Sequence, residues 1–571
     1  MLLQHKIDEN IVLDNYMSVR DILETYEEIT IGEQILEDIL FFTLFEKTFL
    51  FFPPDKDNPS SKANVYLYND ELLDFPHIML REEKITDGTG LPNGTYRWVC
   101  LFEQDSIVNT LVPYEDKIFD CIDRLIELLS MNPVEREREF QKEFMFYWNS
   151  EAGGEKTFVA YLGQESKFME MDAFYGTKKV RLIGQGITLS DIDVRDKSER
   201  KWLHHIESQV YYIPITDGRG ILPPHKGFKW SAYEVQNIVY GKKIEHISDD
   251  TFEQMRTISP KTQNLILVFG MKTAQSNVTF ALRVRCNNCK GHTLLEKLLS
   301  DITTVEPLPT ERKDYLYLCE QIGNDIGLLN KRVLLIGAGS LGSYVAFELV
   351  KNGVQRLKIY DDDKLAEENL LRWAYGGIGV GSNKATLIQM LLNLLHPEIN
   401  VEACAEKLGE KTLMEEIPNM DMIIFTIGNS DEQLKFNSIL KEAKCFIPVI
   451  FVWLEEGGEH SHILVVNYQQ TGCFECLYTD SQGTLVNNRA RKNTGEAMEN
   501  GMIRNGCGGT RAAYGTSILL RTTAALLDTI HDIKEEKITE NTLIDISSDR
   551  IAVSDTEFPM EVCDCCGDSS K

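Results

Sequence analysis

A glycine-rich stretch, KRVLLIGAGSLGS, most constrains how this chain can fold. The β-branched, apolar run Val333–Ile336 predicts a buried parallel strand, and the apolar spacing over Tyr344–Val350 predicts a helix. Between them, Gly337 makes the turn, Gly339 lets the backbone approach a phosphate, and Gly342 lets helix and strand pack closely. The sequence therefore predicts an α/β domain whose helix N-terminus receives an anion.

The residues after this glycine turn narrow the choice of nucleotide. A second predicted strand, Leu357–Tyr360, ends in the acidic run DDD, where Asp361 and Asp363 have the spacing at which a carboxylate meets a ribose hydroxyl. A dehydrogenase needs only such an acid. A plain NAD oxidoreductase would leave the cations that come next without a role.

Three polar and cationic residues follow the acidic run. Asn369 and Arg372 are three positions apart, so we expect them on one face of a helix, and Lys384 follows a predicted N-cap at Ser382. Each alone fits a solvated surface residue. As an ordered set they favour a nucleoside triphosphate, because its additional phosphates need cations that stabilise charge during transfer.

The segments IGAGSLGS, YDDD, ENLLRW and NKA resemble the Rossmann-like adenylation domain of ubiquitin-activating enzymes and of ThiF/MoeB-like enzymes of thiamine and molybdopterin synthesis. The resemblance covers about residues 315–571. It implies ATP-dependent adenylation of a partner protein's C-terminal carboxylate. The residues it implies are Asp361 and Asp363 near ribose and metal, and Asn369, Arg372 and Lys384 on ATP, with Arg372 also catalytic.

The chain departs from this family at the magnesium site. Where the family usually carries an aspartate, after the predicted strand Met422–Thr426, this chain reads Ile-Gly-Asn-Ser-Asp. Gly428 has no side chain to ligate a metal. We therefore expect Mg²⁺ to rely on Asp431 or Asp363.

The length of 571 residues predicts two to four domains. The net charge of −29, with no basic run, argues against a nucleic-acid binder. The N-terminus shows no signal-peptide pattern, and the apolar run Ile39–Phe45 is too short to span a bilayer, so we expect a cytoplasmic protein. In that compartment, 13 cysteines indicate thiol chemistry and metal binding rather than disulfides.

Residues 1–150 read as an α+β domain. The apolar spacing over Ser18–Leu44 predicts helix, and a second helix is expected over Tyr114–Met131. The predicted strands between them are Thr48–Phe52, Asn64–Tyr68 and Arg97–Leu101.

Cys100 closes the last of these strands. A cysteine at a strand end is most often a small buried residue. However, the order PHI (with His77) and then VCL is similar to ubiquitin-conjugating enzymes, in which a histidine motif precedes a strand that ends in the acceptor cysteine. The resemblance implies a thioester on Cys100. The eukaryotic motif also contains an asparagine that assists amide formation; this chain lacks it, so His77 is proposed only as a positioning residue.

Residues 151–312 predict a middle α+β domain, with strands at Val210–Ile213 and Leu265–Phe269. Cys286 and Cys289 have metal-ligand spacing, with His292 nearby, but one CxxC is half of a zinc site. We interpret this pair as structural or incidental.

Two further cysteine pairs lie in the third domain, residues 313–571. Cys473 and Cys476 form one pair, and Cys563 and Cys566 form the other, with Cys565 as a spare thiol; spacing alone leaves open whether Cys563 or Cys565 pairs with Cys566. Four thiolates make a structural Zn²⁺ site. The alternative is free cysteines in a mobile tail.

Cys507 lies in RNGCGGTR, a glycine-rich loop without apolar periodicity. Arg504 and Arg511 flank it, and a predicted helix from Leu519 to Ile530 follows. Cations and a helix N-terminus stabilise a thiolate, so Cys507 is the candidate nucleophile. A free loop cysteine is the alternative.

The order of these features resembles the fused activating and conjugating enzymes of bacterial CBASS antiphage operons. The resemblance implies that ATP and Mg²⁺ activate the C-terminus of a cGAS/DncV-like nucleotidyltransferase, that Cys507 takes it as a thioester, and that Cys100 passes it to amines of target proteins. It also implies a homodimer.

Two alternatives stay open. A sulfur-carrier adenylyltransferase of cofactor synthesis would use the N-terminal half only for docking, so Cys100 would be dispensable. A non-catalytic scaffold would show no ATP–pyrophosphate exchange.

Overall fold

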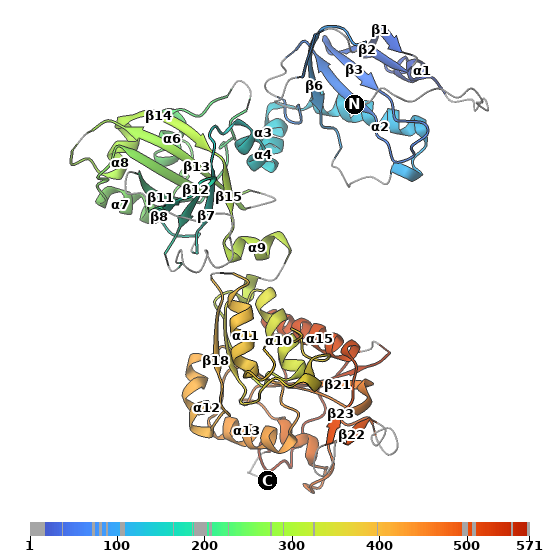
Figure 1. Ribbon diagram of the computed structural model, residues 1–571, viewed down its shortest axis with the longest axis vertical. Coiled ribbons are helices and arrows are strands. Elements are labelled where there is room, and N and C mark those ends of the chain that lie inside the picture. Colours follow the sequence, from blue (N-terminus) through green and yellow to red (C-terminus); the bar gives the residue numbers. More distant parts are fainter. Residues whose placement is uncertain are drawn as a thin grey trace. The chain divides into compact units, whose positions relative to one another are not determined.

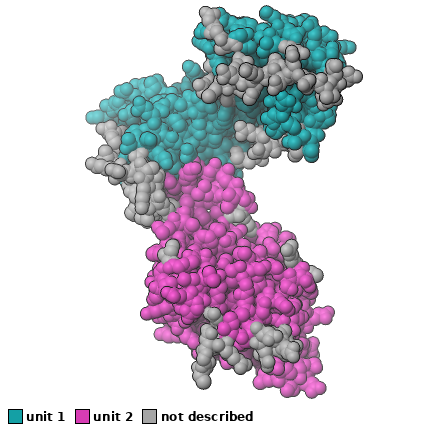
Figure 2. Space-filling model, turned by 45° about the vertical axis from the view of Figure 1, so that its right-hand side comes forward, with its two compact units in different colours: residues 1–160, 165–182, 202–311 teal, residues 161–164, 183–201, 312–571 magenta. Residues whose placement is uncertain are grey.

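The structure is a computed structural model. It describes residues 17–36, 38–70, 75–78, 83–86, 90–102, 109–163, 165–185, 187, 203–204, 208–225, 228–273, 277–288, 290–323, 326–377, 379–396, 398–493, 501–504, 510–549 and 552–567. The chain divides into two compact units (Figure 2). Unit 1 comprises residues 1–160, 165–182 and 202–311, and unit 2 comprises residues 161–164, 183–201 and 312–571.

Unit 1 begins with an antiparallel six-stranded sheet in the order β1-β2-β3-β4-β6-β5. Its strands are β1 (Ile29–Leu36), β2 (Ile39–Leu44), β3 (Lys47–Phe52), β4 (Asn64–Tyr68), β5 (Glu83–Ile85) and β6 (Gly94–Val99). The short α1 (Val19–Leu23), η1 (Asn109–Leu111) and the long α2 (Tyr114–Ser130) accompany it. Ile118, Ile122 and Leu125 of α2 are fully buried in one core with the sheet.

The prediction of helix over Ser18–Leu44 is wrong beyond α1. Residues 39–44 form β2 instead, and Phe42 pairs with Phe49 of β3. Phe45 and Glu46, with φ of 47° and 63°, make the tight turn between the two strands. The apolar spacing of these residues also suited a helix, but burial of their side chains against the neighbouring strands favoured the strand. The strands predicted around residues 48, 64 and 97 and the helix from residue 114 are confirmed.

A second sheet of nine strands follows in unit 1, in the order β14-β13-β12-β11-β8-β9-β7-β15, with β10 paired to β8. Its strands are β7 (Thr157–Tyr161), β8 (Met169–Tyr175), β9 (Lys179–Ile183), β10 (Leu203–His204), β11 (Ser208–Ile215), β12 (Asn264–Lys272), β13 (Asn277–Cys286), β14 (Ile302–Leu308) and β15 (Thr310–Arg312). The helical segments are α3 (Pro133–Lys142), α4 (Phe144–Glu151), α6 (Ala232–Val239), α7 (Asp249–Thr257), α8 (Leu294–Glu296) and η2 (Lys297–Asp301). Trp148 of α4 and Phe280 of β13 are fully buried in its core.

Unit 2, coloured from yellow-green to red in Figure 1, is built on an eight-stranded sheet in the order β18-β17-β16-β19-β20-β21-β24-β25. The strands from β18 to β20 run parallel, and the last three run antiparallel to their neighbours. They are β16 (Arg332–Ile336), β17 (Arg356–Tyr360), β18 (Asn400–Cys404), β19 (Met422–Phe425), β20 (Val449–Leu454), β21 (His460–Val466), β24 (Thr542–Ser547) and β25 (Ala552–Asp555). A separate ribbon joins β22 (Met502–Arg504) to β23 (Thr510–Ala512).

Helices cover both faces of this sheet. They are α9 (Tyr315–Gln321), α10 (Ser340–Lys351), α11 (Lys384–Asn393), α12 (Glu410–Glu416), α13 (Ser430–Glu442) and α15 (Thr516–Lys534), with the short segments η3 (Ile326–Leu328), η4 (Glu367–Asn369), η5 (Ile417–Asn419), η6 (Glu456–Gly458) and η7 (Phe474–Tyr478). Val333 and Leu335 of β16 belong to the core under α10, α11 and α15, whereas Leu334 and Ile336 belong to the core under α12 and α13. Burial on both faces explains why this strand is uninterruptedly apolar.

The strand order creates a crevice at one edge of the sheet. From β16 the chain proceeds through β17 to β18 on one side, and it then returns to β19 on the other side of β16. Such a reversal opens a crevice outside the carboxyl ends of the strands, where doubly wound folds bind ligands. The predicted α/β Rossmann-like fold of this part of the chain is confirmed.

Candidate functional site

The glycine turn between β16 and α10 has the geometry that its sequence predicts. Gly337 adopts a φ of 98°, which a side chain disfavours. A Cβ atom on Gly342 would lie 2.0 Å from the carbonyl oxygen of Gly337. A Cβ on Gly339, in contrast, would meet none of the described atoms within 4 Å. Gly342 is therefore required for packing, and Gly339 leaves open space at the helix N-terminus.

Asp361 holds the backbone near this turn through two hydrogen bonds. Its Oδ2 accepts the N–H of Ala338 at 2.6 Å, and its Oδ1 accepts the N–H of Asp363 at 2.9 Å. Burial raises the pKa of this carboxyl above its usual value. The carboxylate thus joins the end of β17 to the glycine turn, and the residues that line the adjacent cavity do not include it.

A cavity of about 430 Å³ opens at the carboxyl ends of β16, β17, β19 and β20. Several residues singled out in the sequence share its wall. They are Gly339, Asp363, Asn369, Arg372 and Lys384. Fold topology therefore brings together side chains that the sequence spreads over more than one strand-helix unit.

Lys384 is the most buried cation of this wall. Its side chain is 9% exposed, and its Nζ lies 2.8 Å from Oδ2 of Asp363, whose side chain is 70% exposed. Lys384 begins α11, and the N-cap is Asn383, whose Oδ1 accepts the N–H of Thr386 at 3.0 Å. The predicted N-cap at Ser382 is wrong by one residue, because Ser382 instead closes a turn onto the carbonyl of Gly379.

Arg372 is the second cation that lines this cavity. It follows Asn369 through a 3₁₀ turn rather than an α-helix, and its backbone N–H donates to the Asn369 carbonyl at 3.0 Å. Its Nε is buried and has no hydrogen-bond partner among the described residues. The guanidinium lies 5.8 Å from the centre of the Tyr514 ring. Such a group fits a phosphate oxygen.

The sequence did not point to two residues that shape this cavity. Thr426, at the end of β19, donates from Oγ1 to the carbonyl of Gly337 at 2.8 Å and so fastens the turn. Its position at the carboxyl end of a predicted strand was a usable signal. The hydroxyl of Tyr514 lies 3.0 Å from Oγ of Ser340. No local pattern marks Tyr514, since a tertiary contact brings it there.

The two candidate magnesium ligands differ in position. Gly428 lines the cavity where the resembling family has its aspartate. Asp431 is exposed in the first turn of α13, outside the lining residues, whereas Asp363 is among them.

A second cavity of about 530 Å³ adjoins the first, and the two share Gly428, Trp453, Leu454 and Glu456. Gln433 lines the second cavity; the residue is 2% exposed, and its Oε1 has no hydrogen-bond partner among the described residues. This buried amide can accept an N–H from a ligand.

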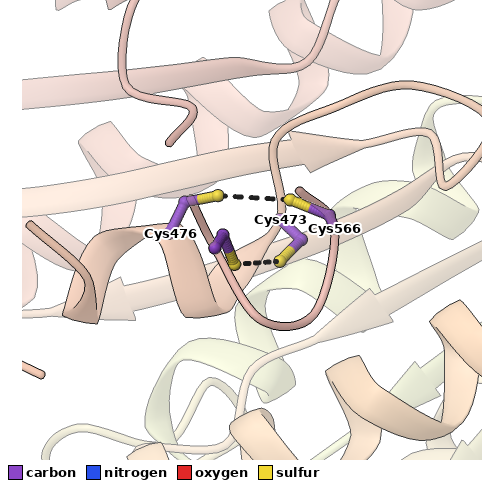
Figure 3. Close-up of side chains that lie close together, drawn as sticks. Cys473, Cys476 and Cys566 are labelled. Carbon is purple, nitrogen blue, oxygen red and sulfur yellow. Dashed lines mark hydrogen bonds between the residues drawn. The ribbon is translucent and has the colours of Figure 1, made fainter. Parts of the chain in front are cut away.

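Four cysteine sulfurs gather between η7 and the end of the chain (Figure 3). They belong to Cys473, Cys476, Cys563 and Cys566; all four residues are buried, and their sulfur atoms lie within 4.8 Å of one another. Closer pairs are Cys473 with Cys563 at 3.9 Å and Cys476 with Cys566 at 3.3 Å. The donor set fits a tetrahedral zinc ion.

Cys565 lies beside this group but outside it, and its sulfur accepts a hydrogen bond from Asn437 Nδ2 at 3.3 Å. Cys563, rather than Cys565, joins the set of four. Hydrogen bonds from neighbouring thiols, foremost Cys476, lower the pKa of Cys473 to about 4, while hydrogen bonding with Cys473 raises that of Cys566.

The candidate nucleophile Cys507 lies outside the described residues, as do the side chains of Arg504 and Arg511. Of the other CxxC motif, Cys289 lies outside them too. Cys286 is buried, and its thiol donates to the carbonyl of Lys297 at 4.0 Å. His292 contacts Asp301 instead, with Nδ1 and Oδ2 2.8 Å apart.

Cys100 in unit 1 lies next to His77. Its backbone N–H donates to the His77 carbonyl at 2.7 Å, and its partly exposed thiol donates to the Phe102 carbonyl at 3.8 Å. The structure thus brings the predicted cysteine and histidine together, at the end of β6.

Within the part of the chain that the structure describes, no helix combines the length and the hydrophobicity that a membrane crossing requires.

Comparison with known proteins finds similarity over part of the chain. Residues 322–563 match the ThiF family. Over 148 residues the chain is 35% identical to the ATP-dependent ubiquitin transferase-like protein Cap2 of Enterobacter hormaechei, which covers 25% of this chain and 24% of that protein. It is 28% identical over 156 residues to the sulfur carrier protein ThiS adenylyltransferase of Escherichia coli, covering 27% and 61%.

Both matches span less than two thirds of the relatives' own lengths. Among solved structures, E. coli MccB with MccA aligns at 20% identity and a TM-score of 0.33, over 42% of this chain and 68% of that one.

Proposed function

We propose, from the match of residues 322–563 to the ThiF family, that the protein uses ATP to activate the C-terminal carboxylate of a partner protein. The observation that carries the proposal is the convergence of the α10 N-terminus, Arg372 and Lys384 on one cavity. ATP would supply the phosphoryl anhydride whose cleavage drives the activation. The three groups together can hold its phosphates and stabilise the negative charge that develops there.

The remaining residues of the site have separable roles in this proposal. Asn369 and Asp363 line the wall and can hydrogen-bond the nucleotide, while Asp361 positions the glycine turn. Asp363 is also the better ligand for Mg²⁺, because it lines the cavity and Asp431 does not.

The adjoining cavity suits the tail of the partner protein. It opens onto the nucleotide cavity through shared residues, and the unpaired Oε1 of Gln433 can accept a peptide N–H. A peptide that ends between the two cavities would bring its carboxylate next to the phosphates, and this proximity favours the reaction.

We further propose that the activated acyl group moves to Cys507 and then to Cys100, from which it is conjugated to amines. Its support is the relative named an ATP-dependent ubiquitin transferase-like protein, together with the placement of Cys100 beside His77. The partner in this proposal is a cGAS/DncV-like nucleotidyltransferase, the setting is antiphage defence in the cytoplasm, and the enzyme acts as a homodimer.

A sulfur-carrier adenylyltransferase is the second candidate, because the chain is also similar to the ThiS adenylyltransferase. It shares the adenylation step and differs afterwards. In that case Cys100 has no part in the reaction.

The test is a non-reducing gel of the full-length protein with ATP, Mg²⁺ and a cGAS/DncV-like partner, comparing wild type with Cys507→Ala and Cys100→Ala. We expect a thiol-sensitive adduct that Cys507→Ala abolishes. Cys100→Ala should retain that adduct and block later conjugates. Conjugates that do not depend on Cys100 would favour the sulfur-carrier candidate, and the absence of ATP–pyrophosphate exchange would point to a scaffold.

A further inference from the structure

We propose that His77, Glu139, Glu143 and Tyr147 form a site beside Cys100 that binds the ammonium group of a lysine side chain, the acceptor in the last transfer. The inference rests on the proposed function, in which Cys100 carries the acyl group, and it names the amine-binding residues of that step.

The backbone around His77 brings the site next to the cysteine. The carbonyl of His77 accepts the N–H of Cys100 at 2.7 Å, and Ile78 forms an isolated antiparallel β-bridge with Val99 of β6. His77 also has a φ of 63°, which is unfavourable for a residue with a side chain. Its N–H donates to the hydroxyl of Tyr147 at 2.7 Å. The strained residue is thus held from both sides of its peptide backbone.

Each ring nitrogen of His77 faces a carboxylate. Nε2 lies 3.5 Å from Oε2 of Glu139, and Nδ1 lies 3.5 Å from Oε1 of Glu143. The side chains of His77, Glu139 and Glu143 are 22%, 20% and 37% exposed, so a ligand can reach them from solvent. Lys142 also contacts Glu139, so Glu143 has fewer cationic neighbours among the described residues.

Tyr147 connects these groups to the cysteine. It is 2% exposed on α4, and burial, the main cause, holds its pKa well above the usual range. The electrostatic effects of Glu143 and Cys100 raise this pKa further, whereas the hydrogen bond from the His77 N–H lowers it. A phenol that stays protonated can donate to Glu143 while it accepts the N–H of His77.

The site has a chemical use in amide formation. A lysine ammonium bound by the two carboxylates would lie near the Cys100 thioester. After it loses one proton to the His77 imidazole, its nitrogen attacks the acyl carbon; the C–N bond forms, the C–S bond breaks, and the electron pair leaves on the Cys100 sulfur. The thiolate then takes the second proton that the nitrogen must lose, so that the products are the amide and the Cys100 thiol.

This arrangement compensates for the missing asparagine of the conjugating-enzyme motif. An asparagine acts on the carbonyl side of the reaction, whereas carboxylates and an imidazole act on the amine. If the four side chains only fasten α3 and α4 to the backbone around His77, replacing them with uncharged residues should change the stability of the protein and leave the selection of the amine unaltered.

The first test measures the site without any transfer reaction. Full-length protein is labelled at Cys100 with cationic aminoethyl methanethiosulfonate or with neutral methyl methanethiosulfonate, and the rates are followed by mass spectrometry of the Cys100 peptide. Each reagent forms a disulfide with the cysteine and releases methanesulfinate. We expect Glu139→Gln/Glu143→Gln to lower the cationic-to-neutral rate ratio about three- to tenfold, since charges a few ångströms away act across partly solvated space.

Matched variants separate charge from structure. Glu137→Gln removes a carboxylate from the same helix, α3, where the described contacts do not join it to His77, and it should leave the ratio unchanged. Tyr147→Phe keeps the buried ring and removes the hydroxyl that holds His77. It should slow discharge of the thioester to lysine without changing the neutral labelling rate.

The second test follows discharge of the Cys100 thioester, formed with partner, ATP and Mg²⁺, to free lysine or to hydroxylamine. The double glutamine variant should lose about tenfold with lysine and little with hydroxylamine, which carries no positive charge at neutral pH. An unchanged labelling ratio, or unchanged discharge to lysine, overturns the inference. If the labelling ratio changes but the protein forms no Cys100 thioester, the ammonium site is supported and the proposed function is wrong.

Discussion

At the scale of single residues, Arg372 and the glycines of the turn have different roles. Arg372 leaves a buried donor unpaired among the described residues, so its side chain contributes little to the folded protein's own hydrogen bonding. Gly342 and Gly339 have opposite surroundings, crowded and open. Substitutions of these residues should therefore distinguish effects on the reaction from effects on the stability of the fold.

Arg372→Ala should lower the rate of ATP–pyrophosphate exchange by about 100-fold, because it removes a cation from the developing negative charge. Its melting temperature should stay close to that of the wild type. Arg356→Ala is the control, since Arg356 is an exposed cation at the start of β17, at the amino end of the parallel strands. Equal losses in the two variants would show that the effect is not local to the cavity.

Gly342→Ala should destabilise the protein by about 1–3 kcal/mol, because its Cβ would collide with the Gly337 carbonyl. Gly339→Ala should unfold like the wild type and yet bind ATP more weakly, since the methyl group occupies space that the phosphate needs. Urea unfolding and ATP titration measure the two effects. A destabilised Gly339→Ala variant would contradict this division.

At the scale of elements, two attachments hold segments of unit 2 in place. The four-cysteine group ties the end of the chain to η7, and Glu398 accepts the Tyr315 N–H at the start of α9 at 3.1 Å. Both depend on buried groups whose charge state changes the free energy of unfolding.

The purified protein should contain about one zinc ion per chain, held by four thiolates. Cys563→Ser should lose this ion and loosen residues 552–567, whereas Cys565→Ser should retain it. Metal analysis and hydrogen exchange of the C-terminal peptides give the readouts. Zinc lost from the Cys565 variant instead would reassign the fourth ligand.

Glu398 should make the stability of unit 2 fall as pH rises. Burial, followed by the charge of Asp314, raises the pKa of Glu398 to about 7, whereas an unfolded glutamate ionises near about 4.3. Between these values only the folded state holds the proton, so the free energy of unfolding decreases through this window, by about 4 kcal/mol in total.

Glu398→Gln stays neutral and should remove this dependence. The difference in unfolding free energy between the variant and the wild type should therefore grow in the variant's favour from about pH 4 to about pH 8. Glu442→Gln, which removes an exposed carboxylate from α13, is the matched control. A difference that stays constant with pH would assign the proton to another group.

At the scale of the whole molecule, the proposed relay needs an acyl group to travel from unit 2 to Cys100 in unit 1. In a homodimer this transfer can occur within one chain or between two. Mixing the inactive Cys507→Ala and Cys100→Ala proteins distinguishes the routes, because only transfer between chains allows the intact cysteines to cooperate. We expect the mixture to restore conjugates on a denaturing gel, and a silent mixture would place the relay within one chain.

The sequence by itself determined the local structure of the nucleotide domain. A β-branched run, glycines with distinct steric needs and a helical repeat each act within a few residues, so β16, its turn and α10 follow directly from composition and spacing. The same holds for α2 and for the strands that the sequence predicted. The cations Arg372 and Lys384 were likewise recognisable, because the number of residues between each of them and the glycine turn can be read from the sequence.

Only the tertiary structure decided which partners those residues meet. Residues 39–44 became strand because β3 lies beside them, and Asp361 turned its oxygens to backbone N–H groups of the glycine turn. Cys563 joined the cysteine cluster and Cys565 did not. Likewise, Glu139 and Tyr147 meet His77 across more than 60 residues, and no sequence spacing encodes such contacts because tertiary packing within unit 1 creates them.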